Sequence, residues 1–290
     1  MDYISRGKEI IASKDGIVAA FGYGSSFFHQ AGYSEKTVKS MDFIFVVDDL
    51  KEWFKNDISK NSECYTDNSK KRLLKIRTKK LKGKTGIIYN VVRNTDVKYK
   101  FGVIEKEDFL NHLNTWDSFY VTGRMQKPVY TFKSTEEIDE AINKNRKNVL
   151  IATLAILNKK EVTLNEMFNE LCSLSYIGDI RFIIENPNKV SNIVKGSLEN
   201  LVSIYSKYSE YIKIDGENVL VNLDKVISDI KLLPSNVKIN NKNISNSLYK
   251  HIKRINFRES ICQPLKGLKI TGIKASFFYL KEKAKKKKLK

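Results

Sequence analysis

Four short runs of apolar residues, separated by polar stretches, mark the first part of the chain. Each run has the length of a buried β-strand, and together they cover residues 16–22, 42–48, 86–92 and 97–104. The stretches between them are compatible with helices or loops. The pattern therefore predicts an α/β or α+β unit that ends near Pro128.

Beyond this unit the apolar residues recur with a helical period. Ser134 followed by Glu137, and Thr163 followed by Glu166, have the spacing of a capping box, which predicts a helix beginning at each. Behind the second box, apolar residues three or four positions apart form one face that we expect to be buried: Leu164, Met167, Phe168, Leu171 and Leu174. A stretch rich in Ser, Asn and Lys at 235–247 predicts a loop or linker.

The last segment of the chain predicts a basic amphipathic helix. From about Ile270, apolar side chains stand three or four positions apart, and lysines occupy most of the positions between them. We expect Phe277, Phe278 and Leu280 to enter a lipid interface, and Lys281 and Lys285 to meet anionic headgroups. The alternative is a solvated, flexible lysine tail.

The chain has 290 residues and a formal net charge of +19, which is concentrated in two segments. Residues 70–84 hold nine basic residues and no acidic one, and residues 281–290 hold seven lysines and one glutamate. Such segments bind polyanions: nucleic acid, anionic lipid headgroups or triphosphates. The sequence lacks the aromatic-interleaved motifs of common RNA-binding modules, which disfavours nucleic acid.

No apolar run reaches the ~20 residues that a membrane span needs. The first residues show neither a secretory signal nor an Arg-rich mitochondrial leader. The three cysteines are far apart and odd in number, which argues against a disulfide framework. These features predict a reducing, cytoplasmic location. The sequence also allows a homo-oligomer.

The turn Tyr23-Gly24-Ser25-Ser26 follows the first predicted strand. Glycine lets the backbone approach a phosphate closely, and the serine hydroxyls and helix amides can hold a triphosphate. Alone, such a turn is usually only a turn. Asp42, however, opens the next strand, and a carboxylate that faces a phosphate-binding turn suits a magnesium-dependent nucleotidyl transfer. The alternative for Asp42 is an ordinary residue at a strand end.

These residues resemble one family, the mitochondrial-type CDP-diacylglycerol synthases (phosphatidate cytidylyltransferases, the translocator assembly and maintenance family). The resemblance covers roughly residues 15–270. It rests on ordered motifs: Tyr23-Gly24-Ser25, Gln30-Ala31-Gly32, Asp42-Phe43-Ile44-Phe45, Val47-Asp48-Asp49, Trp53, Tyr89-Asn90, Lys100-Phe101-Gly102-Val103, Gly123 to Pro128, Leu174 to Arg181, Ser260-Ile261, Gln263, Lys266 and Gly267.

The resemblance implies that phosphatidate and CTP give CDP-diacylglycerol and pyrophosphate with Mg²⁺. It implies an α+β fold with a DNA polymerase β-like nucleotidyltransferase domain at 1–128 and a helical, winged-helix-like domain at 129–235. A linker and a basic amphipathic membrane-contact helix follow at 236–290. We expect a peripheral enzyme on the cytoplasmic face of a bacterial cell membrane, or on the matrix side of the mitochondrial inner membrane in a eukaryote.

The chain departs from the wider fold at the metal strand. That fold usually carries a second aspartate two residues after the first, where this chain has Ile44. Asp48 lies about 20 Å further along an extended strand, too far to share the ion of Asp42. We expect Asp48 to touch the nucleotide from the strand end, unless it or Asp49 merely caps the next element. Phe54 stands where the family often has histidine, so we assign no histidine chemistry.

The remaining site residues are cationic or lie in one Gly-containing turn. Lys100 is expected to pair with a CTP phosphate, with a solvated strand lysine as the alternative. Arg124 and Lys127 suit bidentate and point-charge phosphate contacts, respectively. Tyr176, Asp179 and Arg181 are expected near the phosphatidate phosphate: Asp179 orients Arg181 or reaches the metal, or the two form a structural ion pair.

Two other functions compete with this interpretation. One is nucleotidyl transfer to RNA or another soluble acceptor, with residues 70–84 as the contact surface. The other is a non-catalytic membrane-binding protein that retains the fold. The intact Gly24-Ser25 turn and Asp42 argue against the second.

Overall fold

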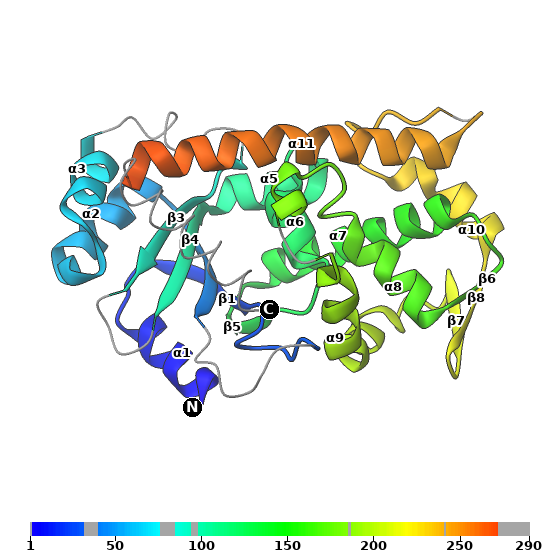
Figure 1. Ribbon diagram of the computed structural model, residues 1–290, viewed down its shortest axis with the longest axis horizontal. Helices are drawn as coiled ribbons and strands as arrows, with labels where there is room; N and C mark the ends of the chain where they lie inside the picture. The colour runs from blue at the N-terminus through cyan, green and yellow to red at the C-terminus, as the bar shows by residue number, and fades with distance from the viewer. Residues whose placement is uncertain are drawn as a thin grey trace.

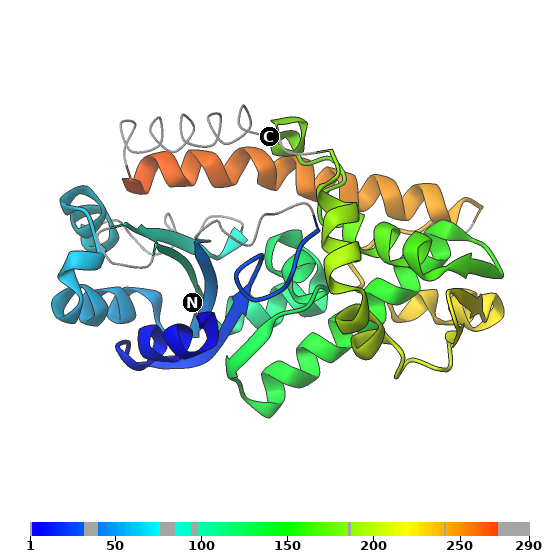
Figure 2. The same cartoon turned by 60° about the horizontal axis from the view of Figure 1, so that its bottom comes forward.

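The computed structural model describes residues 2–31, 40–75, 85–93, 98–184, 187–240 and 242–271. It is a mixed α+β protein with a five-stranded sheet at one end and a mainly helical part at the other (Figure 1). One long helix, α11 (Ile244–Thr271), runs along both parts, as a second view confirms (Figure 2). Among the described helices, none is long and apolar enough to cross a membrane.

The five-stranded sheet has the strand order β3-β4-β2-β1-β5. Only the β2–β4 pair is parallel, and the other three pairs are antiparallel. The strands are β1 (Ile17–Tyr23), β2 (Met41–Val47), β3 (Ile88–Val92), β4 (Tyr99–Glu105) and β5 (Tyr130–Lys133). The four predicted strands are confirmed within two residues at each end. The short strand β5 was not predicted, because its residues alternate between half-buried and exposed.

Helices cover both faces of this sheet, which explains why its strands are apolar runs rather than alternating patterns. One face packs on α1 (Tyr3–Ala12), α2 (Leu50–Lys60) and α3 (Asp67–Lys75). The other face packs on α5 (Lys106–Thr115), α6 (Phe119–Met125) and α7 (Glu136–Leu157). A 3₁₀ turn, η1 (Ser62–Cys64), connects α2 to α3.

The helical part adds a small antiparallel sheet of order β6-β8-β7. Its elements are β6 (Glu161–Thr163), α8 (Leu164–Ser173), η3 (Ile180–Ile184), α9 (Lys189–Tyr205), β7 (Ile212–Asp215), β8 (Asn218–Val221), α10 (Leu223–Asp229) and η4 (Ile230–Leu232). All five apolar positions predicted for the helix after Thr163 are buried in the core that these elements share with α7.

Of the two predicted capping boxes, the N-cap bond of one is present and the other box is wrong. The hydroxyl of Thr163 accepts a hydrogen bond from the Glu166 amide at 3.1 Å, as predicted. Ser134 does not cap α7, because that helix starts one residue later than expected, with Thr135 as its N-cap and no side-chain cap bond. The Ser134 hydroxyl instead donates to Asp139 Oδ1 at 2.7 Å.

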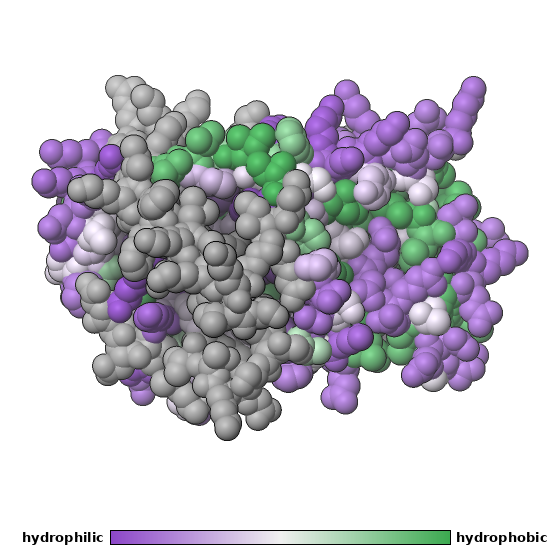
Figure 3. Space-filling view, viewed as in Figure 1, coloured by the Kyte–Doolittle hydropathy of each residue, from purple (hydrophilic) through white to green (hydrophobic). Residues whose placement is uncertain are grey.

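The long helix α11 (Ile244–Thr271) corrects our reading of the end of the chain. A loop was predicted at 235–247, but the helix begins within that range. Its first turns bury apolar side chains in the helical core, and Ile270, near which the predicted basic helix begins, is buried in a core of the sheet as part of α11. Its outer face exposes Phe257, Ile261 and Leu265, and Figure 3 shows apolar side chains along this edge.

Two sets of predicted contacts lie outside the described residues. They are the membrane contacts Phe277, Phe278, Leu280, Lys281 and Lys285, and the part of the basic run from 76 to 84.

Candidate functional site

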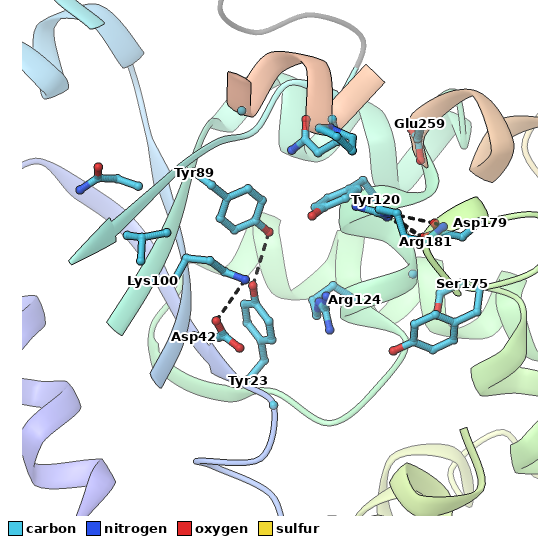
Figure 4. A pocket seen from close by; sticks show the side chains of 18 of the residues that line it. Tyr23, Asp42, Tyr89, Lys100, Tyr120, Arg124, Ser175, Asp179, Arg181 and Glu259 are labelled. Atoms are coloured by element: carbon cyan, nitrogen blue, oxygen red, sulfur yellow. Dashed lines mark hydrogen bonds and ion pairs between the residues drawn. The ribbon is translucent and has the colours of Figure 1, made fainter. Parts of the chain in front are cut away.

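Three site residues form one row across the sheet. The register pairs Tyr23 of β1 with Asp42 of β2, and Asp42 with Lys100 of β4. The row lies on the face that packs on α5, α6 and α7, because Tyr23 belongs to that core. Lys100 Nζ is 3.2 Å from Asp42 Oδ1, and each side chain remains 30% exposed (Figure 4). The sheet thus holds a carboxylate and a cation together at the edge of a cavity.

The Gly24 turn passes directly beside this carboxylate. Gly24 has a φ of +82°, a left-handed conformation that favours glycine. A Cβ atom at this position would lie 3.4 Å from Asp42 Oδ2. The Gly24 carbonyl accepts hydrogen bonds from the amides of Phe27 and Phe28 at 3.2 and 3.0 Å, so the turn is compact. Glycine therefore allows the backbone to turn tightly beside the Asp42 carboxylate.

A cavity of about 730 Å³ opens at this point between the sheet, α6, α9, α11 and the turn before η3. Ten predicted site residues line it: Tyr23, Gly24, Ser25, Asp42, Lys100, Arg124, Lys127, Tyr176, Asp179 and Arg181. They come from segments up to about 160 positions apart, which the fold brings together. The cavity is large enough for a ligand of nucleotide size.

Two predicted nucleotide contacts do not line this cavity. The Ser26 hydroxyl is buried and has no hydrogen-bond partner among the described residues. Asp48 is exposed beyond the end of β2. Its neighbour Asp49 caps α2 by accepting a hydrogen bond from the Glu52 amide at 2.7 Å, which is the capping alternative.

Arg124 lies centrally in the cavity wall. Its guanidinium carbon Cζ lies over the Tyr23 ring, 4.2 Å from the ring centre. No carboxylate among the described residues pairs with this guanidinium. The Tyr23 hydroxyl lies 3.4 Å from that of Tyr89. Burial, followed by the nearby Asp42 carboxylate, raises the pKa of Tyr23, so its hydroxyl stays protonated at neutral pH. Arg124 is thus a cation that faces the cavity and is held by an aromatic ring.

Lys127 is a buried cation, with only 6% of its surface exposed. Its ammonium group donates to the Gly123 carbonyl and, at 2.5 Å, to the Ser175 hydroxyl. Burial and the neighbouring Arg124 lower the pKa of Lys127 to about 7. A bound anion would stabilise its charged form.

Asp179 and Arg181 form a two-point ion pair in the cavity wall. Arg181 Nη2 is 2.5 Å from Asp179 Oδ2, and its Nε is 2.9 Å from Asp179 Oδ1. Arg181 also lies over the Tyr120 ring at 5.6 Å. This pairing is compatible with two of the predicted alternatives, in which Asp179 orients Arg181 or the two form a structural ion pair.

The sequence patterns did not predict the cavity residues that α11 supplies, chiefly Glu259. This carboxylate is 2% exposed and accepts hydrogen bonds from the Phe119 amide at 3.1 and 3.2 Å, at the start of α6. Burial raises its pKa to about 7. The nearby motif residues Gln263 and Gly267 also line the cavity, but the motifs alone assigned them no role. Tyr89, Tyr120 and Lys189 were missed as well.

Asp42 is the candidate metal ligand. Ile44, at the position of the second aspartate, is buried in the apolar core. Within the described ranges, no group of three His, Cys, Asp or Glu side chains could hold a metal ion by itself. Magnesium is commonly held by one or two carboxylates together with substrate phosphates, so the single Asp42 fits an ion that arrives with a nucleotide.

The chain is similar to proteins of one family. A sequence model of the family described as "Phosphatidate cytidylyltransferase, mitochondrial" matches residues 8–226. Relatives with this name share 36% identity over 194 residues in Schizosaccharomyces pombe, 32% over 296 in Saccharomyces cerevisiae and 29% over 258 in Caenorhabditis elegans. These matches cover 65%, 94% and 83% of this chain, and 49%, 69% and 75% of the relatives, respectively. The chain thus spans about half the length of the fission yeast relative.

Proposed function

The chain belongs to the family of mitochondrial phosphatidate cytidylyltransferases, and we propose that it transfers the cytidylyl group of CTP to phosphatidate. The products are CDP-diacylglycerol and pyrophosphate. One observation carries this proposal: the Gly24 turn, Asp42 and Lys100 meet at the edge of a cavity whose opposite wall carries further cations.

We assign the sheet end of the cavity to the CTP triphosphate. Gly24 and Ser25 offer a close backbone approach and a hydroxyl, and Lys100 offers a charge beside them. A divalent metal is consistent with this family, and we propose Mg²⁺ on Asp42. The ion would neutralise the triphosphate and the departing pyrophosphate. Lys100 would then turn from Asp42 to a phosphate oxygen.

We assign Arg124, Lys127, Tyr176, Asp179 and Arg181 to the phosphate of phosphatidate. A phosphate oxygen of the lipid forms the new bond to the α-phosphorus of CTP, while the bond from that phosphorus to pyrophosphate breaks. Because the attacking oxygen is already ionised near neutral pH, the step needs no general base. The residues of the chain accelerate it by positioning both anions and by offsetting their charge.

The finer fold assignments are also proposals. The mixed five-stranded sheet with a carboxylate beside a Gly-Ser turn supports a DNA polymerase β-like nucleotidyltransferase domain at 1–128. The three-stranded sheet with α8 and α9 supports a winged-helix-like domain at 129–235. The third part, 236–290, begins with α11, which packs on both.

We propose that the enzyme works as a peripheral protein on an anionic membrane, since its second substrate resides in a bilayer. The bacterial cell membrane and the mitochondrial inner membrane are the two candidates, and the matched relatives are named mitochondrial. Removing residues 274–290 tests the predicted membrane contacts. The shortened chain should sediment less with phosphatidate liposomes, most visibly at low salt. Unchanged sedimentation would contradict this assignment.

The central experiment incubates the full chain with labelled CTP, Mg²⁺ and phosphatidate liposomes, and measures label in the lipid extract. The wild type should produce labelled lipid. Asp42→Ala should abolish it while circular dichroism shows a folded chain, and the exposed Asp224→Ala should match the wild type. Asp48→Ala decides whether Asp48 contacts the nucleotide. Label in added RNA instead of lipid would favour the soluble-acceptor function.

A further inference from the structure

Helix α9 brings one more cation into the cavity, Lys189, which the sequence analysis did not identify. Lys189 is the first residue of the helix and lines the cavity. Its ammonium group lies 4.9 Å from the centre of the Tyr176 ring. Lys127 approaches the same ring at 5.1 Å. Two lysines from segments about 60 residues apart therefore share one aromatic ring.

The start of α9 is held in place by the loop that follows the Gly24 turn. The Ala31 amide donates to the Asn192 carbonyl at 3.1 Å. A Cβ atom on Gly196 would lie 2.4 Å from the His29 carbonyl oxygen, so only glycine permits this packing. The first half of α9, which begins at Lys189, is thus held beside the loop after the Gly24 turn by two close backbone approaches.

Three cationic side chains lie near this ring: Lys127, Lys189 and Arg124. Lys189 and Arg124 both act on Lys127 as repelling cations. Asp179, which also lines the cavity, is bound at two points by Arg181. Cations gathered in a sheltered cavity repel one another, and a multiply charged anion between them would remove that repulsion. The first amides of α9 add a favourable field for an anion.

We infer that Lys189, together with Lys127 and Arg124, forms the site that receives the phosphate monoester of phosphatidate, distinct from the triphosphate site at Asp42 and Lys100. In Figure 4, Arg124 lies between the Asp42–Lys100 pair and the side of the cavity that carries Ser175 and Asp179. This inference rests on the proposed function and deepens it. Three cations suit a headgroup with two negative charges and three free oxygens. The site therefore selects phosphate monoesters over phosphodiester lipids, which carry one charge.

The test measures binding separately from turnover. Soluble dihexanoyl phosphatidate and CTP are titrated into the full chain by calorimetry, for the wild type, Lys189→Met and Lys189→Arg. Lys195→Met is the matched control, since Lys195 is exposed on the same helix and does not line the cavity. Lys189→Met should weaken phosphatidate binding about 10- to 100-fold, the loss expected for one charge-assisted contact. Its affinity for CTP should stay within about twofold of the wild type.

Two further measurements complete the test. Lys189→Arg should recover most of the affinity, because it retains the charge. The wild type should bind dihexanoyl phosphatidylmethanol, a phosphodiester, at least about tenfold more weakly than phosphatidate. Unchanged phosphatidate binding by Lys189→Met, or a loss that falls on CTP, would overturn the inference. If the wild type makes no CDP-diacylglycerol, the proposed function fails, but the titrations still decide the role of Lys189.

Discussion

The substitution Glu259→Gln tests whether a buried carboxylate joins α11 to α6. Burial is the main cause that raises the pKa of Glu259 from 4.5 to about 7, against the opposing hydrogen bond from the Phe119 amide. Between these two values the folded state binds more protons than the unfolded state. Wild-type stability therefore falls as the pH rises through this window. At 1.36 kcal/mol per pH unit, a difference of about 2.5 units corresponds to about 3 kcal/mol.

Glutamine has nearly the same shape, and its oxygen can still accept from the Phe119 amide, but it cannot ionise. The free energy of unfolding of the variant, minus that of the wild type, should therefore rise by about 3 kcal/mol from pH 4.5 to pH 8. Urea unfolding followed by circular dichroism at several pH values measures this difference. Glu199→Gln, at an exposed position, is the control and should show no such trend. A difference that stays constant with pH would refute the reasoning, because the carboxylate would then be ionised throughout.

Three further predictions concern other parts of the site and its support. Gly24→Ala should lower the free energy of unfolding by about 1–2 kcal/mol, because alanine disfavours the left-handed backbone, and should raise the KM for CTP. Lys127→Met should raise the free energy of unfolding of the ligand-free protein, most strongly below pH 7. This gain should shrink towards pH 10, because the folded-state pKa of Lys127, about 7, lies below the ordinary 10.5. Urea unfolding midpoints of the variant and the wild type across this pH range measure the difference. Lys14→Met should lower the free energy of unfolding by about 3–5 kcal/mol, because it leaves the buried Asp57 carboxylate without its cationic partner at 3.0 Å. Replacing both residues by apolar ones should lower it less. Equal losses for the single and the double variant would contradict this account.

The strands and the Gly24-Ser25 turn could be predicted because their signals are local. The sheet is buried on both faces, so its strands appear as continuous apolar runs whatever their order. The Gly24-Ser25 turn follows the first of these runs directly, and Asp42 opens the second. These residues were therefore identified before any contact was known. A local signal also has limited precision, as the wrong cap at Ser134 shows.

The helix α11 was missed because its buried face changes character along its length. The buried side is apolar at Leu248 and Ile252, polar at Glu259 and Gln263 where it lines the cavity, and apolar again at Ile270. A search for an apolar stripe fails in the polar stretch, although burial continues with helical spacing. The role of Glu259 follows only once the helix is placed beside α6.

The amino-acid sequence alone predicted which segments form strands, offered candidate phosphate-binding residues, and showed a family resemblance. The tertiary structure decided which of these residues meet. Asp42 pairs with Lys100 because β2 and β4 are parallel and in that register, and Lys189 reaches Tyr176 because Gly196 lets α9 pack on the loop after the Gly24 turn. Such pairings depend on contacts between segments far apart in the chain. The favourable free energy of these contacts arises only when the core is formed, so the local sequence pattern does not predict them.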